Sequence, residues 1–358
     1  MARGPPATPV HMRTIVAALL AALVPAVPAQ PPVGAEIPPI EGYVWASQPA
    51  TAGYTASTGY EHNSHGGAVQ IQRSSPGVYQ VRFVGMAGVG GVAHVSSYGG
   101  NGFCTVASWG PSTGDELVNV RCFTPTGVAA DTRFTAHVTN RTDGAARGYL
   151  WSSDPTPPAA GTTPASTWSY DSAGESIVVS ATGTGNYEVE LGAFAQDAGG
   201  AWADAALRVT AYGASPVSCQ IGDPSFYADP EVLRVQCYDP TGSAVNSRFA
   251  LSYVRGVVPV SSTVDNLGGS PDVIGWSSPA GLAPSADEVG DADYLISFPA
   301  AGVAGGHAYA GLVATPPVYC NIQSWTVMAG ALNLRVRCYQ LGNGEPNPAM
   351  LINVGFFT

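Results

Sequence analysis

The sequence has no lysine, because all 14 basic residues among its 358 are arginine. Without lysine the chain cannot form a Schiff base with a carbonyl substrate, and it cannot supply the lysine of a P-loop. Charged residues make up only 11% of the chain, and 25 residues are acidic. Nucleic-acid binding depends on neutralising phosphates with lysine and arginine, so this balance argues against a nucleic-acid partner.

Long hydrophobic runs are also missing beyond the N-terminal region, so we expect no membrane span, which needs roughly 20 apolar residues. The short apolar run Ile15–Val24 follows Met12-Arg13-Thr14 and precedes Val27-Pro28-Ala29, with no acidic residue in 1–29. This order is typical of a Sec-type signal peptide, whether Met1 or Met12 is the start. We therefore predict a signal peptide (1–29), a proline-rich linker (30–41) and a secreted, extracellular protein. Two of the arginines lie in the predicted signal peptide, so the chain after residue 29 has 12 arginines and 25 acidic residues.

The cysteines are few but regularly spaced. The two members of each pair are 18 residues apart in Cys104 and Cys122, Cys219 and Cys237, and Cys320 and Cys338. Alternating runs around a turn signal separate them, a pattern that predicts a β-hairpin with the two cysteines facing each other. Period two places Val118 and Val120 on the face of Cys122, so the bridges should point into the core. We predict three intradomain disulfides and no free thiol, consistent with an oxidising compartment.

Further marks recur in register with the cysteines. An aromatic start appears at Tyr43-Val-Trp45, Tyr149-Leu-Trp151 and Trp276, and a tyrosine-led strand begins at Tyr79, Tyr187 and Tyr294. These marks predict three β domains at 42–138, 148–254 and 272–358. Short alternating strands with frequent turn signals favour an all-β fold of three tandem β-sandwich or barrel-like domains.

The third copy is shorter between its tryptophan and tyrosine marks. The interval is 34 residues from Trp45 to Tyr79 but 18 from Trp276 to Tyr294. We therefore predict one strand fewer in domain 3. The acidic segment 287–293 should then cover the exposed sheet edge, because charges discourage edge pairing.

The first copy resembles a known repeat through Tyr43-Val-Trp-Ala-Ser-Gln-Pro49, Tyr79-Gln-Val-Arg-Phe83 and Cys104-Thr-Val-Ala-Ser-Trp109. It is similar to an uncharacterised repeat of secreted actinobacterial proteins, each copy with one cysteine pair. The resemblance is close in copy one, good in copy two and looser in copy three. It implies export and tandem domains, and it implies no catalytic residues.

Candidate chemistry is sparse. The cysteine pairs lack the clustered thiols or histidines of a zinc site, and we expect neither a metal nor a cofactor. The pairs Asp131 with Arg133 and Asn246 with Arg248 recur, and we interpret them as turn-forming. Trp109 and Trp325 fall out of phase with the inward cysteines, so they are our candidates for exposed aromatics that bind a glycan or a protein.

Three functions follow from these observations. We favour a secreted, non-enzymatic array that binds an extracellular glycan or protein surface, since repeated weak modules raise avidity. The first alternative is a secreted polymer hydrolase with a carboxylate pair. The second is a protease inhibitor that presents the loops after Trp109 and Trp325. The sequence does not define the ligand or the oligomeric state.

Overall fold

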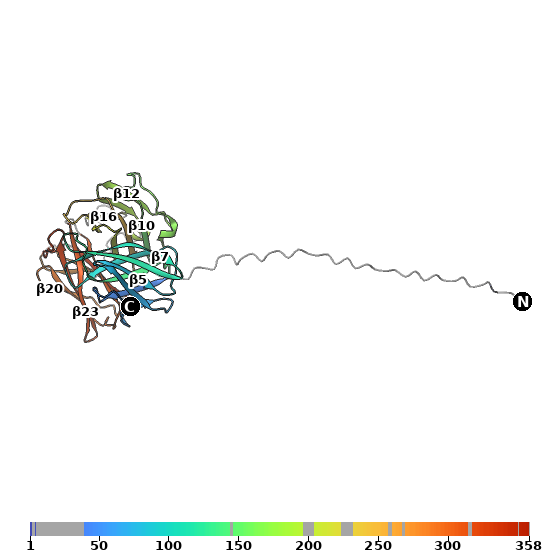
Figure 1. Cartoon of the computed structure of the whole chain (residues 1–358), viewed down its shortest axis with the longest axis horizontal. Coiled ribbons are helices and arrows are strands. Elements are labelled where there is room, and N and C mark those ends of the chain that lie inside the picture. Colours follow the sequence, from blue (N-terminus) through green and yellow to red (C-terminus); the bar gives the residue numbers. More distant parts are fainter. Residues whose placement is uncertain are drawn as a thin grey trace. The chain divides into compact units, whose positions relative to one another are not determined.

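The computed structural model describes Met1, Gly4 and residues 39–143, 146–195, 204–222, 232–256, 260–266, 269–313, 317–349 and 351–357. The predicted signal peptide and most of the predicted linker lie outside these residues. The three repeats belong to one unit rather than to three separate ones (Figure 1). Ile40, within the predicted linker, is already buried in the core of the first repeat.

Almost all described elements are strands. Repeat 1 contains β1 (Glu41–Ala46), β2 (Gly53–Thr55), β3 (Glu61–Asn63), β4 (Val69–Ser75), β5 (Val78–Phe83), β6 (Val92–Tyr98), β7 (Phe103–Ser112), β8 (Asp115–Phe123) and β9 (Arg133–Thr139). Repeat 2 contains β10 (Arg147–Ser152), η1 (Ser166–Trp168), β11 (Ser169–Asp171), β12 (Val178–Gly183), β13 (Asn186–Glu190), α1 (Gly192–Ala195), β14 (Ala206–Tyr212), β15 (Ser218–Ile221), β16 (Val232–Tyr238) and β17 (Arg248–Val254). Repeat 3 contains β18 (Val260–Asp265), β19 (Asp272–Ser277), β20 (Ser285–Gly290), β21 (Asp293–Phe298), β22 (His307–Val313), β23 (Val318–Met328), β24 (Ala331–Gln340) and β25 (Leu351–Phe357).

Each repeat is a sandwich of two half-sheets around its own core. In repeat 1, one half-sheet contains β6, β9, β1 and β3, and the other contains β7, β8, β5, β4 and β2. Their inward side chains meet in one hydrophobic cluster, and repeats 2 and 3 have equivalent clusters. The alternation is regular in β8, where Val118, Val120 and Cys122 are fully buried while Asn119 and Arg121 are partly exposed. The predicted fold class is confirmed.

The half-sheets continue from one repeat into the next. The orders are β20-β21-β24-β23-β6-β9-β1-β3, β11-β10-β17-β14-β7-β8-β5-β4-β2 and β12-β13-β16-β15-β22-β25-β18-β19. Each junction is a short parallel pairing between two repeats, and the bridging pairs are Val106 with Tyr212, Ile221 with Val313, and Tyr98 with Ile322. Repeat 1 therefore pairs with repeat 2, repeat 2 with repeat 3, and repeat 3 with repeat 1. The three repeats close a ring.

The three disulfides join the cysteines that the spacing predicted. Cys104 faces Cys122, Cys219 faces Cys237 and Cys320 faces Cys338, with a Cα separation of 4.0 Å in each pair. The second cysteine of each pair is fully buried, so the predicted inward direction is also confirmed. No described cysteine is free.

Two of the three disulfide hairpins end in tight turns that require positive φ. Thr113 and Gly114 between β7 and β8 have φ of 51° and 91°, and Ala329 and Gly330 between β23 and β24 have φ of 50° and 80°. Positive φ at both central residues is the geometry of a type I′ turn, which suits the twist of a two-stranded ribbon. Residues 110–114 spell Gly-Pro-Ser-Thr-Gly, the spacing of a hydrolase nucleophile elbow. Here they form a β-hairpin rather than a strand-to-helix turn, so they do not build that site.

Repeat 3 differs from the prediction. Its eight strands are as many as in repeat 2 and one fewer than in repeat 1, counted in the described residues. The strand that the prediction left out is nevertheless present, because β20 pairs with β21 as β4 pairs with β5. Its first strand, β18, lies between the predicted domains 2 and 3, and it pairs with β25 as β1 pairs with β9. Trp276 lies in the second strand of the repeat, β19, and not in the first. The interval from Trp276 to Tyr294 is therefore shorter than the interval from Trp45 to Tyr79, which starts in a first strand. The acidic segment is not a cover over an empty edge, because Asp287 and Glu288 lie in the edge strand β20 itself.

Candidate functional site

The two predicted binding aromatics lie at junctions between repeats. Trp109 is only 8% exposed, which contradicts the expectation that it faces solvent. The physical reason is a β-bulge between Val106 and Ser108, which inserts one residue and reverses the alternation. Trp109 therefore pairs with Val118 on the core side. A bulge at the equivalent place in β23 puts Trp325 opposite Leu334, and Trp325 is half-buried.

Around Trp109 four aromatic rings form what we call the first aromatic cluster: Trp109, Trp151, Trp168 and Tyr212. The ring centroid of Trp109 lies 6.0 Å from that of Trp151, 5.6 Å from Trp168 and 5.5 Å from Tyr212, each in an edge-on arrangement. Repeat 1 contributes one ring and repeat 2 contributes three, so the cluster spans the junction. The three partners of Trp109 are half-buried, and the four rings line a hollow of about 50 Å³.

The second aromatic cluster lies at the junction of repeats 3 and 1 and contains Trp45, Tyr60, Tyr98 and Trp325. Trp325 lies 5.7 Å from Trp45 and 5.2 Å from Tyr98, measured between ring centroids. Its indole N–H donates to the carbonyl of Gly305 at 3.2 Å. All four rings are half-buried, so each presents part of its surface to solvent.

The two clusters are equivalent by position in the sheets. Trp45 and Trp151 occupy the same place in β1 and β10, and Tyr98 and Tyr212 form the bridging pairs of their junctions. At the third junction the corresponding positions hold Thr263 in β18 and Val313 in β22. The described residues therefore carry two aromatic clusters of this kind for three junctions.

Buried polar side chains lie where the three repeats meet, and we call them the central cluster: His94, His137, Arg208, His307, Tyr309 and Asn353. His94, Arg208 and Tyr309 each stand four residues before the bridging residue of their repeat, so one position holds three different side chains. All six are at most 5% exposed. Sequence analysis missed this cluster, because equivalent positions of the three repeats hold different residue types.

Hydrogen bonds and ring stacking between repeats hold the central cluster. The imidazole Nδ1 of His94 lies 3.0 Å from the hydroxyl of Thr210, and the guanidinium of Arg208 lies 3.4 Å from Nδ1 of His137. The His137 and His307 rings stack at 5.1 Å between centroids. Burial lowers the pKa of His137 to about 4, and it holds the pKa values of His94 and His307 well below their usual range. These histidines are neutral at pH 7 and act as polar packing groups.

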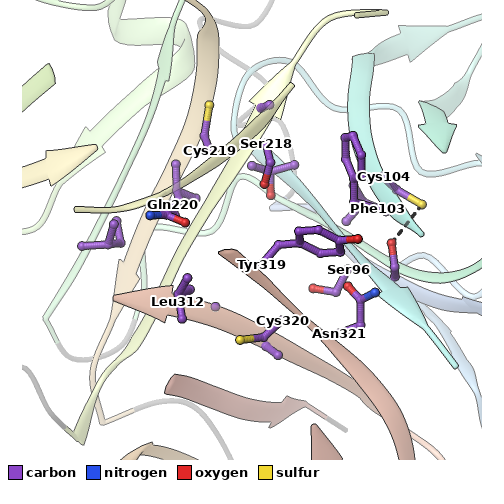
Figure 2. A pocket seen from close by; sticks show the side chains of 18 of the residues that line it. Ser96, Phe103, Cys104, Ser218, Cys219, Gln220, Leu312, Tyr319, Cys320 and Asn321 are labelled. Atoms are coloured by element: carbon purple, nitrogen blue, oxygen red, sulfur yellow. Dashed lines mark hydrogen bonds between the residues drawn. The ribbon is translucent and has the colours of Figure 1, made fainter. Parts of the chain in front are cut away.

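A small cavity of about 70 Å³ also lies where the repeats meet (Figure 2). The first cysteine of each disulfide lines it, together with polar side chains that include Ser96, Gln220 and Asn321. Asn321 donates to the carbonyls of Gly100 and Gly102, which ties repeat 3 to repeat 1. A space of this size holds a few waters, so we assign it to packing rather than to a ligand.

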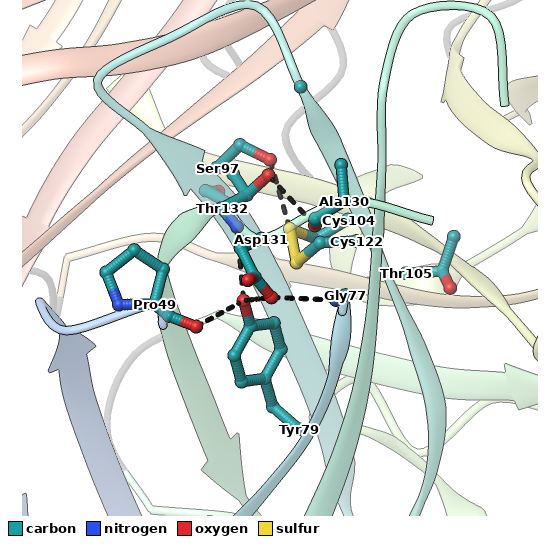
Figure 3. The surroundings of a disulfide bond; sticks show 12 residues. Pro49, Gly77, Tyr79, Ser97, Cys104, Thr105, Cys122, Ala130, Asp131 and Thr132 are labelled. Atoms are coloured by element: carbon teal, nitrogen blue, oxygen red, sulfur yellow. Dashed lines mark hydrogen bonds between the residues drawn. A yellow bond between two sulfur atoms is a disulfide. The ribbon is translucent and has the colours of Figure 1, made fainter. Parts of the chain in front are cut away.

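The recurring Asp131 and Asn246 orient turns, as the sequence indicated. The Asp131 carboxylate accepts hydrogen bonds from the Gly77 backbone N–H and the Tyr79 hydroxyl, each at 3.0 Å, beside the Cys104–Cys122 bridge (Figure 3). It also pairs with Arg73 at 2.8 Å. In repeat 2 the side-chain oxygen of Asn246 accepts from the Gly185 N–H at 2.8 Å. The shared contact is structural in both repeats.

One further carboxyl group is fully buried. Glu116 in β8 has no ion pair in the described part of the chain, and its contact is the Gly88 N–H at 3.4 Å. Burial raises the pKa of Glu116 to about 8, although the hydrogen bond from Gly88 lowers it. The folded protein therefore carries Glu116 as a neutral acid at pH 7.

Replacing Glu116 by glutamine should change the pH dependence of stability. The unfolded chain loses this proton near pH 4.5, whereas the folded chain keeps it to about pH 8. Stability is therefore lost as pH rises through this window, by about 1.4 kcal/mol per pH unit. We expect Glu116→Gln to be more stable than the original protein at pH 8 but not at pH 4, measured by urea unfolding. Glu288→Gln, at an exposed glutamate, is the control, and parallel pH profiles for Glu116→Gln and the original protein would refute the assignment.

Comparison with known proteins adds nothing to this description. No protein family, no curated protein and no solved structure showed significant similarity to the chain. Among the described residues there is no helix with the length and apolarity needed to cross a membrane, and no group of three or more potential metal ligands.

Proposed function

We propose that this protein is a secreted, non-catalytic binding protein that holds an extracellular glycan at its two aromatic clusters. One observation carries the proposal. A cluster of four aromatic rings lies at each of two junctions between repeats, and the two clusters occupy equivalent positions. Pyranose rings present C–H groups on one face, and these groups pack against the negative face of an aromatic ring. Because one protein molecule carries two such clusters, a polymer is favoured as the ligand over a single small sugar.

Two clusters act together on a repeating ligand. Once one cluster holds a chain, the second meets the same chain at a high effective concentration, so weak contacts give strong retention. Burial of Trp109 supports this role, because Trp109 then fixes the angle of Trp168 and Trp151 rather than contacting the ligand itself. The rigid rings lose little conformational entropy on binding. The three disulfides support export, since disulfides persist in oxidising compartments.

Retention on insoluble polymers tests the proposal. The chain without residues 1–29 is mixed with chitin, cellulose and bacterial cell wall, and the bound fraction is measured after washing. We expect retention on at least one polymer. Trp168→Ala should weaken retention at least fivefold, corresponding to about 1 kcal/mol or more. Trp276→Ala is the matched control, because Trp276 is half-buried but belongs to neither aromatic cluster.

Three results would contradict the proposal. If the protein bound none of the polymers, the proposal that its ligand is a glycan would be contradicted. Release of soluble sugar from a polymer by the protein would show catalysis and favour a hydrolase instead. Equal loss in Trp168→Ala and Trp276→Ala would show that the aromatic clusters are not the binding surface.

A further inference from the structure

A second pocket is lined in part by residues of the central cluster and shares no lining residue with the aromatic clusters. It has a volume of about 170 Å³ and contains residues of all three repeats. Repeat 1 contributes Glu41 and His137, repeat 2 contributes Arg147 and Arg208, and repeat 3 contributes Phe357. Because its walls come from three repeats, the pocket exists only in the closed ring.

Two arginines of this pocket are buried without an acidic partner among the described residues. Arg147 is 7% exposed and Arg208 is 5% exposed, and neither forms an ion pair within the described part of the chain. The Nε of each has no hydrogen-bond partner there. Their remaining contacts are to neutral groups: Arg147 donates to the Arg141 carbonyl at 3.3 Å, and Arg208 lies 3.4 Å from His137 Nδ1. Buried charges are normally paired, because an unpaired one carries a large desolvation cost.

The acidic groups nearby are already engaged. Glu41 pairs with Arg141 at 2.8 Å and lies 3.6 Å from His137 Nε2. Asp143 pairs with the same Arg141. Three arginines thus face two carboxylates, and the local formal charge is +1 in a chain whose net charge is −11. Counted over the described residues, the pocket therefore lacks one negative charge.

The geometry of Arg208 suits recognition of a planar anion. Its guanidinium carbon lies 4.6 Å from the ring centroid of Tyr309 and 4.3 Å from that of Phe357, so two aromatic rings hold it in place. A guanidinium fixed in this way loses little freedom when it binds, and its parallel N–H groups match the two oxygens of a carboxylate. Val92, Tyr149 and Val254 provide apolar walls.

We propose that this pocket binds a small organic monocarboxylate, with its carboxylate between Arg147 and Arg208 and its apolar body against Tyr149 and Val254. The single missing charge favours a monoanion over a phosphate dianion. The volume favours a ligand near the size of benzoate, because a cavity of about 150 Å³ accommodates benzene. This site is independent of glycan binding at the aromatic clusters.

Binding of sodium benzoate to the full mature chain tests the site. Isothermal titration calorimetry should show one site per chain, and thermal unfolding should shift to higher temperature with benzoate but not with benzamidine, which has the same shape and a positive charge. Arg208→Met and Arg147→Met should each weaken benzoate binding at least tenfold. Arg133→Met is the matched control, because Arg133 lies in β9 outside the pocket and should leave binding unchanged.

Stability measurements separate loss of the site from loss of the fold. Without benzoate, Arg208→Met should unfold at the same or a higher temperature than the original protein, since methionine removes a buried unpaired charge and keeps most of the volume. A folded Arg208→Met protein that binds benzoate as the original does would overturn the proposal. Absence of benzoate binding by the original protein would also overturn it, as would binding of sulfate in its place, which would indicate a site for an inorganic oxyanion.

Discussion

Replacing Trp109 by alanine is expected to lower the free energy of unfolding by about 3–5 kcal/mol, the range for truncating a buried tryptophan. Trp109 is the ring of the first aromatic cluster that repeat 1 supplies, and it contacts three aromatic residues of repeat 2. Its removal would leave a cavity at the junction of repeats 1 and 2. Urea unfolding followed by circular dichroism measures the change.

The matched variant is Trp109→Phe. The indole N–H of Trp109 is buried and has no hydrogen-bond partner in the described residues, so phenylalanine keeps a ring and removes an unsatisfied donor. We expect Trp109→Phe to cost less than half of what Trp109→Ala costs. If both variants unfold like the original protein, the aromatic cluster does not hold the junction together.

Acidification is expected to destabilise the protein strongly between pH 6.5 and pH 4. The folded chain keeps His94, His137 and His307 neutral in this range, whereas the unfolded chain takes up a proton at each histidine near pH 6.5. The contribution of these three histidines to stability is therefore fully present above pH 6.5 and is lost as pH falls. His137 alone, with its pKa lowered to about 4, accounts for about 3 kcal/mol at pH 4.

His307→Phe isolates one contribution to this acid sensitivity. His307 stacks between aromatic neighbours, and neither of its ring nitrogens has a hydrogen-bond partner in the described residues. Phenylalanine keeps the stacking and cannot take up a proton, so stability should fall less steeply below pH 6.5. His62→Phe, at an exposed histidine that also stacks on Tyr43, is the control. A His307→Phe profile as steep as that of the original protein would contradict this account.

Local features of the fold were predictable, and features that depend on long-range pairing were not. The spacing of Cys104 and Cys122 gave the hairpin, its register and its inward face, because all three depend on neighbouring residues. The bulge at residue 107 leaves no mark in the composition of β7, so the direction of Trp109 was predicted wrongly. The first strand of repeat 3 was missed because Thr263 stands where Trp45 and Trp151 stand in the other repeats.

The candidate sites show the same limit. Tryptophans 109 and 325 stood out because both follow a cysteine by five residues, and the structure places both in aromatic clusters. Arg147 and Arg208 did not stand out, since they are 61 residues apart in sequence and no equivalent arginine recurs in repeats 1 and 3. Only closure of the ring brings them to one pocket. A search for recurring residues cannot find a site whose members differ at equivalent positions.

Closure of the ring also determines the order in which the chain can reach its final state. The junction of repeats 3 and 1 joins Asn321 to Gly100, across 221 residues of sequence. Loop-closure entropy has to be overcome before such a contact forms, so folding with this topology is slow compared with a chain of independent domains. As the chain emerges from N-terminus to C-terminus, the edge of β6 stays unpaired until β23 is available. An exposed strand edge is prone to pair with other chains, so nascent molecules are most vulnerable to aggregation before repeat 3 arrives.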